Sequence, residues 1–328
     1  MQDAARPKGS MPLAGGWCWF DRVEMLERGR PAQIVPASDL PPDMLNALTQ
    51  PRPDFAGLTV DRPRIMGILN VTPDSFSDGA RFLDPAAALA QGRAMAGAGA
   101  DILDVGGEST RPGAAPVPVA EEIARTAPVI AALRQSGLSL PISIDTRKAG
   151  VAQAALTAGA DAVNDVSALG YDPGLADVVV RAGVPVVLMH AQGSPETMQD
   201  DPRYGDVLLD VYDALAAHVA RAEAAGITRR RIVIDPGIGF GKNVAHNLAL
   251  IRGLSLFHAM GLPVMLGASR KRFIGVIGGA GDAAGRMPGS LAVAIAAVAQ
   301  GVQILRVHDV DATRQALALW QAVKGTMG

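Results

Sequence analysis

Residues that can do chemistry stand at the ends of short apolar runs along this chain. Asp145 and Asp235 each end such a run, Asn164 lies near the end of a third, and Lys271 follows a fourth. Taken singly, each aspartate has an ordinary structural explanation, because an aspartate after a strand is a common helix N-cap. Capping does not explain eight consecutive run ends with polar or glycine-rich sequence in a chain that is only 19% charged. We therefore expect one site built from many strand ends.

Two features near these run ends could be mistaken for other chemistry. Lys271 is flanked by Arg270 and Arg272, which suit either a Schiff-base lysine with a lowered pKa or an anion-binding site. The glycine-rich segment 237–243 looks like a phosphate-binding loop, but its glycine–lysine spacing is one residue too short. It also lacks the third glycine of a dinucleotide-binding fingerprint in the required place. The segment therefore matches neither nucleotide-binding motif.

The apolar runs alternate with helical segments from residue 64 onward. Most runs are continuously hydrophobic, which is typical of parallel strands buried on both faces. The expected strands are 64–69, 101–105, 141–145, 161–165, 185–189, 231–235, 263–267 and 303–307. The expected helices are 85–97, 119–135, 149–158, 173–181, 206–225, 243–260, 288–300 and 310–323. Eight such units predict an α/β protein with a (β/α)8 TIM barrel, and a doubly wound open sheet is the alternative.

Residues 1–62 lack this alternation. They hold eight of the 23 prolines and two of the three tryptophans, and segment 17–25 could form a short strand. We predict a partly irregular N-terminal extension over 1–62 that packs on a barrel formed by 63–328.

Composition narrows the possible classes of protein. Hydrophobic residues make up 49% of the chain, which excludes a disordered protein. A net charge of −2 and 4% aromatic residues argue against nucleic acid or an anionic membrane as partner. The single cysteine, Cys18, excludes an internal disulfide, and no apolar stretch is long enough for a membrane helix or a signal peptide. We expect a soluble cytoplasmic protein.

At its strand ends the chain resembles the dihydropteroate synthases, pterin-binding barrels of folate biosynthesis. The matching segments are 67–79, 104–113, 143–146, 164–165, 188–190, 235–242, 269–273 and 306–310. The resemblance implies a transferase that condenses 6-hydroxymethyl-7,8-dihydropterin diphosphate with p-aminobenzoate, giving 7,8-dihydropteroate and diphosphate. It also implies Mg²⁺ as cofactor, a homodimer and a target of sulfonamides.

The resemblance assigns the pterin to five residues. Asp145, Asn164 and Asp235 would hydrogen-bond its polar edge, with Lys271 beside the ring and Met189 packed on it. A carboxylate can accept two hydrogen bonds from the pterin's N–C–N edge, which favours an acid at position 235.

The diphosphate is expected at the end of the last strand. Arg306 and His308 stand at alternate positions, so they would face the same side and clamp it. With Asp145, Asp235 and Lys271, these two residues complete the expected catalytic set.

The other substrate contacts follow from the same resemblance. The Thr110 hydroxyl would also serve the diphosphate. Mg²⁺ would take one side-chain oxygen from Asn70, besides diphosphate oxygens and water. The loop around Arg111 and Pro112, together with Ser269, would hold the p-aminobenzoate carboxylate.

The expected reaction is dissociative. Loss of diphosphate would leave a stabilised cation at the pterin methylene, so catalysis would lie in charge stabilisation and positioning, without a covalent enzyme intermediate. Phe76 would close over the arriving amine.

Three other functions compete with this interpretation. A methyltetrahydrofolate methyltransferase-type barrel shares the pterin slot but has no use for Asn70, Arg306 and His308 together. A catalytically silent barrel paralogue would be expected to lack residues of its first or its second loop, and both loops are complete here. A Schiff-base aldolase would be revealed by borohydride trapping on Lys271.

Overall fold

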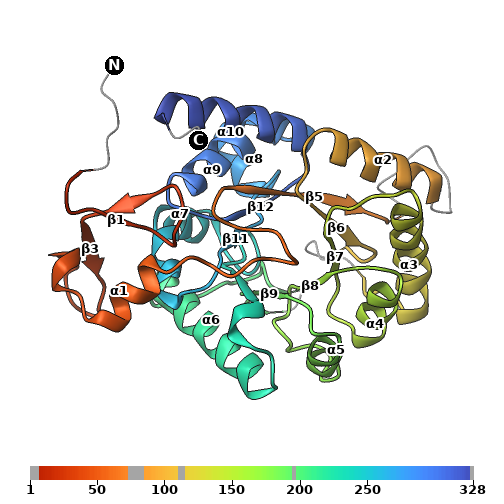
Figure 1. Cartoon of the computed structure of the whole chain (residues 1–328), viewed down its shortest axis with the longest axis horizontal. Coiled ribbons are helices and arrows are strands. Elements are labelled where there is room, and N and C mark those ends of the chain that lie inside the picture. Colours follow the sequence, from red (N-terminus) through yellow and green to blue (C-terminus); the bar gives the residue numbers. More distant parts are fainter. Residues whose placement is uncertain (1–6, 73–84, 110–114, 194–196, 326–328) are drawn as a thin grey trace.

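Eight parallel strands form a closed barrel at the centre of the molecule (Figure 1). The structure is a computed structural model that describes residues 7–72, 85–109, 115–193 and 197–325. The strands are β5 (Arg64–Asn70), β6 (Ile102–Gly106), β7 (Ile142–Asp145), β8 (Ala162–Asp165), β9 (Val186–Met189), β10 (Ile232–Asp235), β11 (Met265–Leu266) and β12 (Ile304–Val307). Their order is β10-β9-β8-β7-β6-β5-β12-β11, and a parallel bridge between Ile234 and Val264 joins the two ends. The predicted barrel is confirmed, and the open sheet is excluded.

Helices surround this ring of strands (Figure 1). They are α2 (Pro85–Gly97), α3 (Val119–Gln135), α4 (Ala149–Thr157), α5 (Leu175–Ala182), α6 (Val207–Ala224), α7 (Val244–Arg252), α8 (Arg272–Gly278), α9 (Met287–Val298) and α10 (Val310–Lys324). Side chains alternate along each strand, so that Ile65 joins the core under the helices while Met66 points into the barrel. This alternation also decides which polar side chains reach the interior at the upper strand ends.

The helix predicted over 243–260 is wrong in its second half. Helix α7 ends at Arg252, and a 3₁₀ segment (Leu254–Met260) follows. Gly253 separates them, and a Cβ at this position would lie 2.6 Å from the Leu208 side chain. The glycine therefore both weakens the helix and permits close packing on α6. The short helix α8 was not predicted, because its two glycines obscure a helical pattern.

The N-terminal extension lies beside the barrel, next to α7 and α9 (Figure 1). It contains β1 (Met11–Pro12), β2 (Trp19–Phe20), β3 (Arg22–Met25), β4 (Gln33–Pro36) and α1 (Pro42–Thr49). The indole of Trp17 donates to the carbonyl of Val298 over 2.8 Å. The guanidinium of Arg28 pairs with Asp210 and Asp213 on α6, each at 2.6 Å. These contacts attach the extension to two helices of the barrel.

Phe55 of the extension closes the lower end of the barrel. Its side chain is 1% exposed and belongs to a cluster of inward-facing residues at the starts of the strands. The other buried members are Val60, Met66, Ile102, Ala162, Val187, Val233, Met265 and Ile304. The extension thus supplies the barrel floor, at the opposite end from the polar strand ends.

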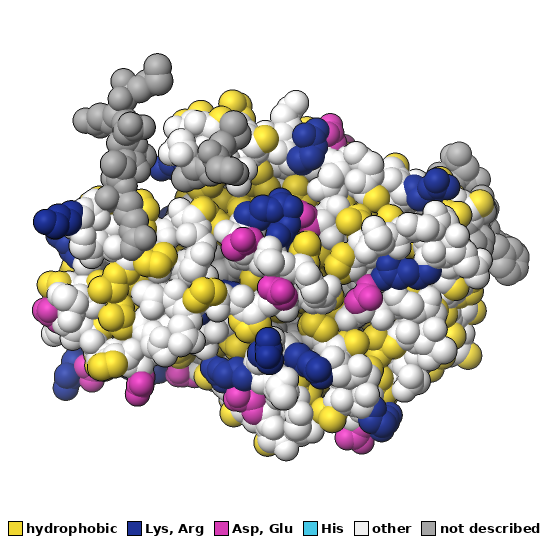
Figure 2. Space-filling view, in the orientation of Figure 1, with side chains coloured by type: hydrophobic (Ala, Val, Ile, Leu, Met, Phe, Trp, Pro, Cys, Tyr) yellow, Lys and Arg dark blue, Asp and Glu magenta, His cyan; other side chains and the backbone are white. Residues whose placement is uncertain are grey.

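The surface carries charges of both signs. On the face shown in Figure 2, lysine and arginine side chains lie dispersed among acidic ones. Among the described residues, no helix is both long and apolar enough to cross a membrane.

Candidate active site

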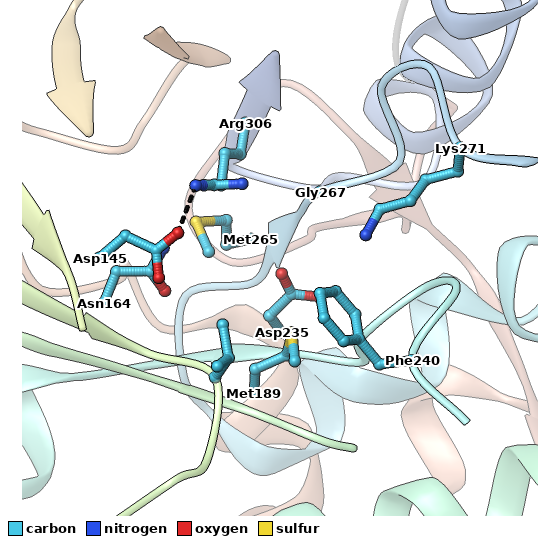
Figure 3. A pocket seen from close by; sticks show the side chains of 10 residues that line it. Asp145, Asn164, Met189, Asp235, Phe240, Met265, Gly267, Lys271 and Arg306 are labelled. Carbon is cyan, nitrogen blue, oxygen red and sulfur yellow. Dashed lines mark hydrogen bonds and ion pairs between the residues drawn. The ribbon is translucent and has the colours of Figure 1, made fainter. Parts of the chain in front are cut away.

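A pocket with about 300 Å³ of empty space, which includes space open to solvent, lies at the carboxyl ends of the strands (Figure 3). It brings together six residues that the sequence singled out, from five different strands and one following loop. The ten lining residues are Asp145, Asn164, Val166, Met189, Asp235, Phe240, Met265, Gly267, Lys271 and Arg306. In Figure 3, Asp145 and Asn164 lie on one side, Asp235 and Phe240 on another, and the Lys271 amine points inward between Phe240 and Arg306. The pocket therefore combines acidic, amide and cationic groups around apolar side chains.

Arg306 is held by two buried carboxylates. Its Nε donates to Asp104 Oδ2 and its Nη2 donates to Asp145 Oδ2, each over 2.6 Å. Burial opposes the positive charge, but the charges of the two carboxylates outweigh it and raise the pKa of Arg306. A guanidinium has five N–H donors, so these two bonds leave it able to bind a further anion.

Asp145 has one oxygen bound to Arg306 and one oxygen without a hydrogen-bond partner among the described residues. Burial raises its pKa to about 7, against the lowering effect of Arg306. Within the described part of the chain, its Oδ1 is buried and has no hydrogen-bond partner. Leaving a buried acceptor without a donor costs free energy, so this oxygen is suited to a ligand that brings an N–H group.

Asp235 lies 3% exposed at the end of β10. Its Oδ1 accepts from the backbone N–H of Gly237 over 2.7 Å. Gly237 has φ +69°, and a Cβ there would lie 1.8 Å from the carbonyl oxygen of His190, so only glycine fits this turn. Burial raises the pKa of Asp235, while the Gly237 N–H and the charge of Lys271 act in the lowering direction. The loop thus fixes one carboxylate oxygen and directs the carboxylate to the pocket.

The Lys271 amine lies over an aromatic ring. Its Nζ is 3.9 Å from the centre of the Phe240 ring, a cation–π contact. The carbonyl of Phe240 accepts from the buried Lys242 amine over 2.9 Å, which fixes the loop that carries this ring. Lys242 Nζ also lies 2.9 Å from His190 Nδ1, and burial lowers the pKa of this histidine to about 3. His190 is therefore a neutral, hydrogen-bonded core residue behind the pocket.

Three predicted residues lie at the strand ends beside the pocket. Ser269 Oγ accepts from the His308 backbone N–H over 3.2 Å and lies 3.0 Å from His308 Nδ1. Asn70 is the last residue of β5 and pairs with Gly106 of β6. Gly106 pairs in turn with Asp145 of β7. The same edge of the barrel therefore carries all three. The other predicted residues, Phe76, Thr110, Arg111 and Pro112, lie outside the described residues.

Comparison with known proteins identifies the family. Residues 66–308 match the model of the family described as pterin binding enzyme. The chain belongs to the pterin-binding enzymes. Over 265 residues it is 45% identical to the dihydropteroate synthase of Escherichia coli K12, covering 81% of this chain and 93% of that protein. Within the pterin-binding enzymes it therefore belongs to the dihydropteroate synthases.

Solved structures of pterin-binding enzymes agree with this placement. A dihydropteroate synthase of Xanthomonas albilineans with 4-aminobenzoic acid is 50% identical, with a TM-score of 0.78, over 84% of this chain and 99% of that one. The same enzyme in complex with 7,8-dihydropteroate is 47% identical over the same shares, with a TM-score of 0.75. The Yersinia pestis enzyme, solved as a sulfonamide drug complex, is 44% identical, with a TM-score of 0.78, over 82% of this chain and 98% of that one.

Several residues of this pterin-binding enzyme's pocket were not predicted. Met265 and Gly267 occupy alternate positions of a predicted strand, so its inward face could have indicated them. Phe240 stands in the glycine-rich segment already singled out. Asp104, which lies behind the pocket and contacts Arg306, is the most informative omission, because a charged residue inside an otherwise apolar strand is itself a signal.

Proposed function

We propose that the chain catalyses the condensation of 6-hydroxymethyl-7,8-dihydropterin diphosphate with p-aminobenzoate. The observation that carries this proposal is the pocket itself. It presents two buried carboxylates, Asp145 and Asp235, with Asn164 beside them, and two basic side chains are among its lining residues. A pterin is a flat heterocycle with an amide and a guanidine-like edge, so it needs this mixture of acceptors and donors.

In this proposal basic side chains of the site handle the negative charge. Arg306 and His308 bind the departing diphosphate, while the Lys271 amine lies beside the pterin ring. The neighbouring Ser269 hydroxyl receives the p-aminobenzoate carboxylate, with Phe76, Thr110, Arg111 and Pro112 completing the substrate contacts. The carbon–oxygen bond breaks first, and the amine then attacks the methylene carbon and releases a proton. Fixed charges and positioning provide the rate enhancement.

We further propose Mg²⁺ as the cofactor, bound by the amide oxygen of Asn70. No group of three or more His, Cys, Asp or Glu suited to a metal occurs among the described residues. One hard oxygen ligand on the half-buried Asn70 fits an ion that keeps water and takes its other ligands from diphosphate. Bound there, the ion would supply positive charge to the leaving group.

The decisive experiment is diphosphate release by the purified protein. It uses the pterin diphosphate with Mg²⁺, in the presence and absence of p-aminobenzoate. We expect amine-dependent release with formation of dihydropteroate in equal amount. Tight pterin binding without turnover would identify a silent barrel, and absence of pterin binding would refute the proposal. Borohydride treatment should leave Lys271 unmodified.

Pterin binding should weaken as the pH falls below about 7. Ligand N–H groups bind the ionised form of Asp145, whose pKa burial raises to about 7. Affinity should therefore drop up to about tenfold per pH unit on the acid side. Calorimetric titration at pH 6, 7 and 8 measures this, and Asp145→Asn should flatten the profile. Asp145 affects folding stability in the opposite direction. Because its pKa is raised in the native state, its contribution to the free energy of unfolding is present at low pH and lost as the pH rises through about 7.

The proposal also includes assembly, location and inhibition. Exposed apolar side chains on α8 and α10 support a homodimer, and both of these helices pack against α9. The exposed side chains are Val276, Ile277, Leu319 and Val323. Light scattering after gel filtration measures the assembly. A single cysteine suits a cytoplasmic protein. The complex of the Yersinia pestis relative supports sulfonamides as inhibitors.

A further inference from the structure

Asp104 is a fully buried carboxylate that touches the pocket only through other side chains. It lies in the middle of β6, is 0% exposed and does not line the pocket. Its strand neighbours Leu103 and Val105 are apolar and also fully buried. A carboxylate in such a place is costly unless charged and hydrogen-bonded partners compensate it.

One oxygen of Asp104 binds two pocket residues. Its Oδ2 accepts from Arg306 Nε over 2.6 Å and from Asn164 Nδ2 over 3.0 Å. Arg306 stands on β12 and Asn164 on β8, each two strands away from β6 in the barrel order. The carboxylate therefore ties together side chains from opposite sides of its own strand.

The two bonds fix orientations as well as positions. A carboxylate only accepts hydrogen bonds, so the amide of Asn164 must turn its Nδ2 toward Asp104. Its Oδ1 is then the atom on the other side of the amide, available to an N–H of a ligand. Arg306 is bound at Nε by Asp104 and at Nη2 by Asp145, so its guanidinium plane is determined by two contacts.

We propose that Asp104 is a positioning residue, which orients Arg306 toward the diphosphate and the Asn164 carbonyl toward the pterin before substrate binds. The inference deepens the proposed function and rests on it. Neither role requires Asp104 to touch substrate. Both require its negative charge, since a neutral side chain would hold the guanidinium less firmly.

The first test is Asp104→Asn, which keeps shape and removes charge. We expect kcat to fall roughly tenfold to a hundredfold, the cost of misplacing a group by about an ångström. The KM for p-aminobenzoate should stay within about threefold, because the contacts of Asp104 in the described part of the chain are with Arg306 and Asn164 and not with Ser269. Ser143→Ala is the matched control: Ser143 is the buried Cα partner of Asp104 on β7, and its hydroxyl has no hydrogen-bond partner among the described residues. This control should retain wild-type rates.

A second arm asks whether Asp104 acts through Arg306. In an Arg306→Lys background, Asp104→Asn should lower kcat by less than about threefold further, because the Nε contact is already lost and the remaining contact, with Asn164, acts on pterin affinity. If the kcat losses of the two single variants multiply in the double variant, the inference is wrong. It is also wrong if Asp104→Asn alone keeps the wild-type kcat. If Asp104→Asn fails to fold, Asp104→Ser removes the same charge with a smaller side chain and should give the same pattern.

The pH profile separates positioning from a general packing defect. Asp145 is faced by Arg306 and by the carboxylates of Asp104, Glu122 and Asp165, and the charge of Asp104 acts to raise its pKa. Arg306 lowers this pKa by more than Asp104 raises it, so a loosened Arg306 should move the midpoint for pterin binding to higher pH in Asp104→Asn. A midpoint at lower pH would show that Arg306 keeps its place without Asp104 and would contradict the inference. Turnover of the wild type is measured first. An inactive wild type refutes the proposed function, and the pH dependence of pterin binding then tests the positioning role of Asp104 by itself.

Discussion

Asp235→Asn should reduce kcat/KM for the pterin diphosphate by about a thousandfold or more while leaving the fold intact. Asp235 Oδ1 already accepts from the Gly237 N–H, so a carboxamide must choose between two unfavourable orientations. With its oxygen toward Gly237, its amino group faces the N–H donors of the pterin. With its amino group toward Gly237, two N–H groups oppose each other in the loop. Together with the lost charge, about 4 kcal/mol of binding should disappear.

Two measurements check this expectation. Calorimetry gives the pterin affinity of the variant, and thermal unfolding should show stability equal to or above that of the wild type, because the variant no longer buries this charge. Asp177→Asn on the exposed face of α5 is the control and should change neither quantity. Pterin affinity within threefold of the wild type in Asp235→Asn would show that this carboxylate does not bind the ring.

The barrel and most of its pocket could be predicted because they follow from regular alternation. Each buried strand carries inward and outward side chains in turn, and the inward polar ones meet at one end. Asp145, Asn164, Met189 and Asp235 are found at or near strand ends on this basis. The resemblance of the chain to a known family then assigned roles that spacing alone left open, such as the choice between an anion site and a Schiff base at Lys271.

Contacts across the barrel could not be predicted in this way. Asp104 meets Asn164 and Arg306 at sequence separations of 60 and 202 residues. Strand alternation indicates that all three side chains point inward, but not that one oxygen serves both donors. That outcome depends on the stagger of the strands and on the side-chain conformations.

The N-terminal extension shows a second limit of sequence patterns. Phe55 lies between prolines and outside any periodic segment, so nothing local indicates burial. Its environment is created by the lower ends of the surrounding strands, whose inward side chains would otherwise enclose a void. Because interiors are packed as densely as organic crystals, an open barrel end needs a large apolar group to fill it.

Phe55→Ala should therefore destabilise the protein by about 3–5 kcal/mol. Phe55 is 1% exposed and belongs to one buried cluster with Met66, Val233 and Ile304, so removal of its ring leaves a cavity that the rigid strands cannot fill by relaxing. Urea denaturation followed by circular dichroism measures the loss. Phe55→Leu, which keeps most of the apolar volume, should lose distinctly less stability, about 1 kcal/mol.

Phe55→Ala also tests whether the floor of the barrel affects the site at the other end. Phe55 lies at the floor and the pocket lies at the opposite strand ends, so the folded fraction of Phe55→Ala should retain wild-type kcat at low temperature. A loss below about 1 kcal/mol would mean that the extension does not fill the floor in solution. A large fall in kcat without a loss of stability would instead mean that the floor determines the geometry of the site. The packing of Phe55 predicts that Phe55→Ala lowers the stability and leaves kcat unchanged.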